Sequence, residues 1–113
     1  MIHEDNRRVL VDWACDKAKT IKTVIAKEDC ELGKHYHKLK TEKFMLVSGS
    51  AVCIIEKDPP FFMEPFKEVV INPGVTHTFQ LFEDSVLLCQ VDKKYNPDDD
   101  YECSGNSRKQ AKR

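Results

Sequence analysis

The sequence predicts an all-β protein, a sandwich or barrel of short strands, and three observations lead to this class. Runs of about six residues alternate apolar or β-branched side chains with polar ones, which is the pattern of half-buried strands. Turn-forming pairs, such as Gly49-Ser50 and Pro73-Gly74, separate these runs at spacings of about ten residues. Periodicity of the helical kind is scarce. The 113 residues have room for one barrel interior but not for a second catalytic domain.

The first two expected strands are 8–15 and 20–27. In the first, every second residue is apolar, and these residues would share one side: Val9, Val11, Trp13 and Cys15. Trp13 is expected to pack in the core or in a dimer interface. In the second, two interleaved sets would face opposite sides of a sheet: Ile21, Thr23, Ile25 and Lys22, Val24, Ala26.

The remaining expected strands lie in the second half of the chain. Gly49-Ser50 joins the runs 42–48 and 51–56, and such a pair between two apolar runs is typical of a hairpin. The runs 67–72, 77–82 and 85–91 follow, with Pro73-Gly74 and Glu83-Asp84 as the turns between them.

Two segments do not have the pattern of strands. Residues 58–66 combine three prolines with three phenylalanines and Met63, so we expect a loop that carries apolar side chains. This loop is expected to close one barrel end or to lie in a dimer interface; a lid is the alternative. We assign residues 1–100 to the barrel domain and residues 101–113 to a polar, flexible tail.

Composition excludes several classes of function. The net charge of −1 gives no general attraction to nucleic acid or to a membrane surface, and no apolar run is long enough to span a bilayer. The N-terminal residues are polar, unlike a signal peptide. The five cysteines form no CxxC pair, which is typical of free thiols, so we expect a cytoplasmic protein.

Four residues carry most of the functional information: His35, His37, Glu42 and His77. Side chains two apart on a strand share a face, so His35 and His37 can both point into the barrel. A tight turn after His37 would bring Glu42 back on a neighbouring strand, and His77 would come from a third strand of the same wall. Three imidazoles and a carboxylate suit one divalent transition metal, namely Fe, Mn, Ni, Co, Cu or Zn.

The spacing of these residues resembles the two motifs of the cupin superfamily. The segment from His35 to Gly49 reads HxH, four residues, Glu, six residues, Gly, and is similar to the first motif. Pro73-Gly74-Val75-Thr76-His77 is similar to the second motif. Asp29 stands where the family has a glycine, and Gly33 would supply the bend instead. The resemblance implies a single double-stranded β-helix, or jelly-roll barrel, in which these four residues bind the metal and the chain forms a homodimer.

A second, less specific resemblance concerns cupins that process nucleotide sugars. The stretch His35-Tyr36-His37-Lys38 and the acidic, tyrosine-containing end of the chain are similar to segments of dTDP-sugar ketoisomerases, epimerases and polysaccharide-biosynthesis cupins. The resemblance implies a small-molecule substrate and an isomerase or epimerase acting on a sugar-derived carbonyl compound. Glu42 would be a metal ligand or the catalytic base, and Gln90 and Tyr95 are candidate pocket residues.

Alternatives remain open at three places. The same ligand set holds Fe(II) in dioxygenases, and a binding module without catalysis is a third possibility. Four lysines near the site would attract an anionic substrate or form a solvated strand edge: Lys34, Lys38, Lys40 and Lys43. We expect Tyr36 to point out of the barrel and the run 98–100 to be a solvated acidic turn.

Overall fold

The computed structural model describes residues 1–102 and contains eleven strands: β1 (Ile2–Glu4), β2 (Val9–Val11), β3 (Thr20–Ile25), β4 (Cys30–Tyr36), β5 (Glu42–Ser48), β6 (Ala51–Ile55), β7 (Phe61–Phe62), β8 (Val69–Ile71), β9 (His77–Leu81), β10 (Val86–Val91) and β11 (Tyr101–Glu102). No helix occurs in this part of the chain, so none of its segments is a helix that could span a membrane. The predicted all-β class is confirmed.

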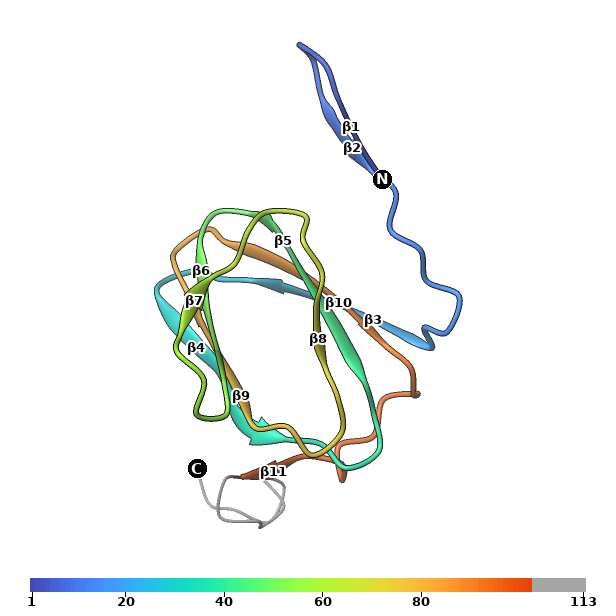
Figure 1. Ribbon diagram of the computed structural model, residues 1–113, viewed down its shortest axis with the longest axis vertical. Helices are drawn as coiled ribbons and strands as arrows, with labels where there is room; N and C mark the ends of the chain where they lie inside the picture. Colours follow the sequence, from blue (N-terminus) through green and yellow to red (C-terminus); the bar gives the residue numbers. More distant parts are fainter. Residues whose placement is uncertain (103–113) are drawn as a thin grey trace.

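Two antiparallel sheets face each other and enclose the core (Figure 1). One sheet has the order β3-β10-β5-β8 and the other β11-β4-β9-β6-β7. Strands β3 to β6 and β8 to β10 turn apolar side chains inward, and these form one cluster of buried residues. Phe44 of β5 and Phe79 of β9 meet at its centre, with ring centroids 4.4 Å apart.

The Gly49-Ser50 corner joins two sheets and does not close a hairpin, which corrects the sequence-based expectation. β5 pairs with β8 and β10, whereas β6 pairs with β7 and β9. The local turn was read correctly, because Gly49 has a φ of 82°. The pairing of β5 and β6 depends on how their apolar faces are buried across the barrel. These contacts are long-range, so a local turn sequence does not predict them.

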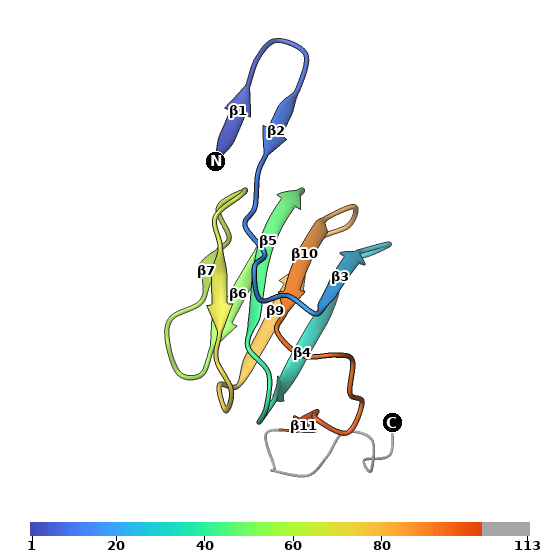
Figure 2. The same ribbon diagram turned by 90° about the vertical axis from the view of Figure 1, so that its right-hand side faces the viewer.

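The N-terminal strands form an arm outside the barrel. β1 pairs only with β2, and Figures 1 and 2 show this hairpin extending beyond the barrel at the end opposite to β11. The expected strand 8–15 is therefore shorter. On its expected buried side, Val11 and Trp13 are half-buried, but Val9 and Cys15 are exposed. Trp13 lies after the arm and donates a hydrogen bond from Nε1 to Glu68 Oε2 at 2.8 Å.

The two segments without a strand pattern are both partly paired. Phe61–Phe62 forms the edge strand β7, Met63 is buried in the core, and Phe62 is 69% exposed. Tyr101–Glu102, which belongs to the expected tail, pairs with the end of β4. The rest of the expected tail, 103–113, lies outside the described residues.

Candidate metal centre

Three imidazoles and one carboxylate meet inside the barrel at the end where β11 lies. The rings of His35 and His37 have centroids 4.6 Å apart, and those of His35 and His77 are 4.8 Å apart. One nitrogen atom from each of the three rings lies within 4.8 Å of the others. Glu42 Oε1 lies 3.2 Å from His37 Nε2 and 3.5 Å from His77 Nε2.

The four side chains come from both walls of the barrel. His35, on β4, is paired in register with His77, on β9, so these two share a wall. Glu42 begins β5 in the opposite sheet, where it is paired with Val91 and Ile71. The expectation that Glu42 returns on a strand next to His35 is wrong, because the segment 37–41 crosses from one sheet to the other.

A β-bulge decides that His35 points into the barrel. Leu32 packs against the core, so strict alternation along β4 would also turn Lys34 and Tyr36 inward and His35 outward. The pairing of β4 with β9 shifts between Gly33 and His35, and Gly33 and Lys34 both have positive φ angles, of 125° and 63°. The extra residue reverses the facing of the strand beyond it. Tyr36 consequently points out of the barrel, as expected, and its ring stacks on that of Tyr101.

Hydrogen bonds fix the tautomers of two of the histidines. His37 Nδ1 contacts the carbonyl oxygen of Asp99, and His77 Nδ1 lies 2.9 Å from the carbonyl oxygen of Val75. A carbonyl oxygen only accepts, so each Nδ1 must carry the proton and donate it. In the neutral ring the lone pair is then on Nε2, the nitrogen that faces Glu42.

Three buried atoms therefore face one another, and with neutral rings none of them carries a hydrogen atom. His37 Nε2, His77 Nε2 and Glu42 Oε1 lie at ion-pair distances, but none of them makes a well-directed hydrogen bond. All three are acceptors when the rings are neutral, and buried acceptors need a cation or a proton to compensate them. Imidazole nitrogens and a carboxylate oxygen are suitable ligands for a divalent transition metal, so the donor set fits such an ion.

The other oxygen of Glu42 is surrounded by positive charge. Lys22 Nζ lies 3.2 Å and Lys40 Nζ 3.8 Å from Glu42 Oε2, and the Cys89 thiol donates to the same oxygen at 3.7 Å. Burial raises the pKa of Glu42, but hydrogen bonds that the His37 and His77 rings donate when Nε2 is protonated, and the charge of Lys22, outweigh it and hold the pKa well below its usual range. Burial, followed by the charge of Glu42, raises the pKa of Cys89 to about 12, so this thiol stays protonated.

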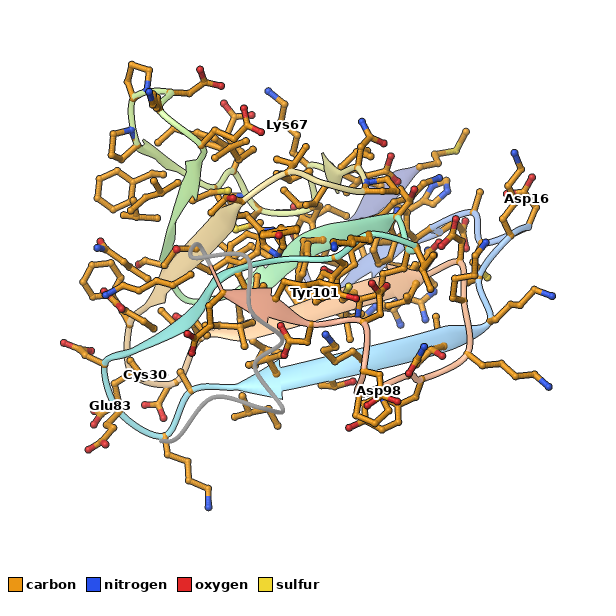
Figure 3. The ribbon with its side chains drawn as sticks, turned by 90° about the horizontal axis from the view of Figure 1, so that it is seen from below. Asp16, Cys30, Lys67, Glu83, Asp98 and Tyr101 are labelled. Atoms are coloured by element: carbon orange, nitrogen blue, oxygen red, sulfur yellow. The ribbon has the colours of Figure 1, made fainter. Side chains whose placement is uncertain are left out.

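The acidic run 98–100 supports the histidines, contrary to the expectation of a solvated turn. Asp99 is buried, and its carboxylate accepts hydrogen bonds from the backbone N–H groups of Lys38 (2.8 Å) and Leu39 (3.2 Å). Asp100 Oδ1 lies 3.2 Å from His35 Nδ1. Only Asp98 is exposed; in Figure 3, which looks at this end of the barrel, it lies nearer the margin than Tyr101.

Two candidate pocket residues lie elsewhere. Gln90 points to the outer face of its sheet, where Nε2 donates to the carbonyl oxygen of Ala14 at 3.1 Å. Tyr95 is 79% exposed. The inward positions on β10 belong instead to the buried residues Leu87, Cys89 and Val91, because strict alternation leaves Gln90 on the opposite face.

The four lysines near the motif do not act together. Lys34 pairs with Glu31, Lys38 lies over the ring of Tyr101, and Lys43 faces outward from β5. Only Lys40 reaches Glu42. Lys22 was not among the candidates, although the alternation of strand 20–27 placed it on one face with Val24 and Ala26, and a charge on an apolar face is a usable signal.

Replacing Asp99 with alanine is expected to weaken zinc binding about 10- to 100-fold, because the segment that carries His37 loses the carboxylate that fixes it. Unfolding free energy should also fall by about 2 kcal/mol, since two backbone N–H groups lose their acceptor. Zinc titration against a competing chelator and urea unfolding measure the two effects. Asp98→Ala, at an exposed neighbour, is the control; equal zinc affinity in both variants would contradict the role of Asp99.

Acid should remove the stabilising contribution of Glu42. Its pKa is lower in the folded than in the unfolded protein, where it is about 4.3. The contribution of the ionised carboxylate is therefore complete above that pH and is lost as the pH falls toward the lowered pKa. Urea unfolding of the metal-free wild type and of Glu42→Gln, between about pH 3 and pH 6, should show a stability difference that shrinks on acidification. A difference independent of pH would contradict this assignment.

Solved structures with the same fold include an epimerase, a sugar 3,4-ketoisomerase and a capsular polysaccharide assembling protein. An rmlC epimerase from Mycobacterium tuberculosis superposes with a TM-score of 0.74 at 18% identity, over 90% of this chain and 64% of that one. The sugar 3,4-ketoisomerase QdtA from Thermoanaerobacterium thermosaccharolyticum, solved in complex with TDP, gives 0.75 at 19% identity, over 88% and 81%. The capsular polysaccharide assembling protein CapF from Staphylococcus aureus gives 0.65 at 24% identity, over 90% and 32%.

The chain thus spans less than two thirds of the length of the epimerase and about a third of CapF. No protein-family model matches the sequence, and no curated protein does. At these identities the structural matches establish the fold. The chain has the RmlC-like cupin fold, a jelly-roll barrel, as the histidine and glutamate motifs predicted.

Proposed function

We propose that this protein is a metal-dependent isomerase or epimerase that acts on a small, sugar-derived carbonyl compound. The observation that carries the proposal is the set of three buried acceptor atoms, from His37, Glu42 and His77, that face one another without a donor. The fold supports the reaction class, because structures that share it include a sugar epimerase and a sugar ketoisomerase. The ketoisomerase complex with TDP supports a nucleotide sugar as the first substrate to test.

His37, Glu42 and His77 would hold one divalent transition metal, with His35 as the fourth ligand or as a neighbouring base. When bound, such an ion polarises a substrate carbonyl as a Lewis acid. Three protein ligands leave coordination positions for substrate, as in catalytic metal sites. Access is from the side of His35 and Lys40, whose side chains are each 15% exposed, whereas Glu42 and His77 are each 1% exposed.

His35 is better suited than Glu42 to move the substrate proton. The lowered pKa of Glu42 favours a permanent carboxylate ligand and makes it a weak base. Asp100 contacts Nδ1 of His35 and would stabilise the imidazolium, which leaves Nε2 to accept a proton. His35 would remove the proton next to the carbonyl, while the electron pair moves onto the carbonyl oxygen. A proton delivered from water to the other face of the same carbon gives an epimer. Return of the proton to the former carbonyl carbon gives an isomer, while the proton of the neighbouring hydroxyl moves to the former carbonyl oxygen.

Solvent exchange tests this reaction directly. Zinc- or manganese-loaded protein is incubated with dTDP-4-keto sugars in D2O, and deuterium next to the carbonyl is followed by NMR. We expect incorporation that is lost in His35→Gln and in protein stripped by a chelator, but kept in Glu31→Gln, an exposed site on β4. Exchange that survives complete metal removal would refute the metal dependence. The absence of exchange with every sugar tested would refute the isomerase proposal.

The same protein preparation tests the two alternatives. Three imidazoles and a carboxylate also suit Fe(II), so oxygen consumption by the iron-loaded protein would indicate a dioxygenase. Tight binding of a nucleotide sugar without turnover would indicate a binding module.

We also propose that the protein works as a homodimer. An isolated two-stranded hairpin is marginally stable in water, yet the β1–β2 arm makes its strand pairs only within itself in the described chain. The outer face of the edge strand β3 exposes Ile21 (57%) and Ile25 (65%), which a second copy would cover. Analytical ultracentrifugation at micromolar concentration should give a dimer for the wild type and a monomer for Ile21→Lys. A monomeric wild type would contradict the proposal.

A further inference from the structure

The inner face of the barrel carries two lysines at the metal centre. Lys22 lies on β3 opposite Cys89, which in turn lies opposite Phe44; both of these neighbours are fully buried. Residues paired in this way share a face of the sheet, so Lys22 belongs to the row that lines the interior. Lys40 enters from the crossing segment 37–41 and is only 15% exposed. Lysine is rarely placed inside a barrel unless it has a partner there.

Their present partner is a single oxygen atom. Both ammonium groups contact Glu42 Oε2, at 3.2 and 3.8 Å, while Oε1 of the same carboxylate faces His37 and His77. Two positive groups thus share one negative charge, because Asp100 contacts His35 instead and the Asp99 carboxylate accepts from backbone N–H groups. The Lys22 side chain remains 39% exposed, so the pair is open to a ligand that enters from solvent.

Metal binding would change this balance. With neutral imidazoles, Glu42 and Asp100 offset Lys22 and Lys40 in the metal-free cluster, and the buried Asp99 adds one more negative charge. A divalent ion ligated by Glu42 brings two further positive charges and draws on the same carboxylate that holds the lysines. The cluster would then carry a net positive charge, which is costly in a partly buried site unless an anion accompanies it.

We propose that Lys22 and Lys40 form a subsite for an anionic group of the substrate, next to the metal position. The inference rests on the proposed function and specifies its substrate class: a carbonyl compound that bears a carboxylate or a phosphate close to the reacting carbonyl. Because both ammonium groups contact one oxygen atom now, one anionic oxygen of the ligand can contact both. Charge-assisted hydrogen bonds of this kind are among the stronger polar contacts in proteins.

The rival explanation is structural: the lysines only neutralise Glu42 and take no part in ligand binding. The two explanations differ for the metal-free Glu42→Gln variant, which keeps the volume of the side chain but frees both lysines of their partner. The subsite predicts that this variant binds oxalate or inorganic phosphate more tightly than metal-free wild type. A structural role alone predicts no change in anion affinity.

The experiment is a calorimetric titration of oxalate and of inorganic phosphate into zinc-loaded wild type, Lys22→Gln, Lys40→Gln and the control Lys43→Gln. Lys43 follows Glu42 on β5 but faces outward, beside Gln90 and Asp92. We expect each of the first two substitutions to weaken binding of one of the anions about tenfold, and Lys43→Gln to leave it unchanged. The preferred anion identifies the charged group on the substrate.

Unchanged affinity in Lys22→Gln and Lys40→Gln, or no anion binding by zinc-loaded wild type, would overturn the subsite. These outcomes are separate from those of the proposed function. Zinc content is measured in the same samples and deuterium exchange reports the isomerase reaction, while metal-free Glu42→Gln tests the lysines without a metal. Circular dichroism of each variant verifies that it is folded.

Discussion

Replacing Glu42 with alanine is expected to abolish metal binding and to lower the free energy of unfolding of the metal-free protein. Glu42 is the only carboxylate that contacts His37 and His77 among the described residues, and its side chain is 1% exposed. Its removal leaves Lys22 and Lys40 without their shared counter-charge. Breaking a fully buried ion pair costs about 3–5 kcal/mol. We expect about 2–3 kcal/mol here, since Lys22 reaches solvent and water can screen part of the charge.

Elemental analysis of the purified protein and urea unfolding measure these two effects. Wild type should carry close to one metal per chain, and Glu42→Ala and His37→Ala should carry almost none. Glu31→Ala, which removes an exposed glutamate paired with Lys34, should match wild type in both measurements. Glu42→Gln separates the lost charge from the cavity that alanine leaves. A Glu42→Ala variant with the wild-type metal content would refute the site, and a metal-free wild type that resists reconstitution would refute the metal itself.

The sequence was sufficient for the fold class and for most barrel strands. Alternation over 20–27, 77–82 and 85–91 corresponds to β3, β9 and β10 within two residues at each end. Strand partners were harder to predict. The Gly49-Ser50 corner has the local chemistry of a hairpin, but β5 and β6 each find partners far along the chain. A period-2 pattern predicts that one face of a strand is buried, but it does not identify the strands that pair with it.

In the candidate site, too, contacts between residues close in sequence were easier to predict than contacts between residues far apart. The spacing of His35, His37 and Glu42 was enough to predict a cluster, because those residues are close in sequence. Asp99 lies 62 residues from His37 and holds it through a backbone carbonyl, a contact that residue identity does not encode. Gln90 was misassigned because its facing depends on the strand register, and an error of one residue inverts it. Lys22 was visible in the alternation, since it shares a face with apolar residues.

Replacing Gly33 with alanine is expected to disrupt both the β4–β9 pairing and the metal centre. A Cβ atom at this position would lie 2.5 Å from the carbonyl oxygen of His77 and 2.9 Å from Thr78 Cα. Both are backbone atoms, so the strands must separate. The φ of 125° adds strain for any residue with a side chain. We expect a loss of stability on the order of 3 kcal/mol and zinc affinity at least tenfold lower, measured by urea unfolding and chelator competition.

Gly74→Ala is the matched control, because Gly74 also has a positive φ, of 85°, but no atom lies within 4 Å of a Cβ built there. It should show only the backbone strain, about 1 kcal/mol, and normal zinc affinity. Equal effects of the two substitutions would mean that the close approach of β4 to β9 is unimportant. A larger effect at Gly33 follows from the role of the bulge: it lets Leu32 pack in the core while His35, three residues later, faces the same interior. Without that extra residue the His35 side chain would point to the outer face, and the inward positions would be those of Lys34 and Tyr36.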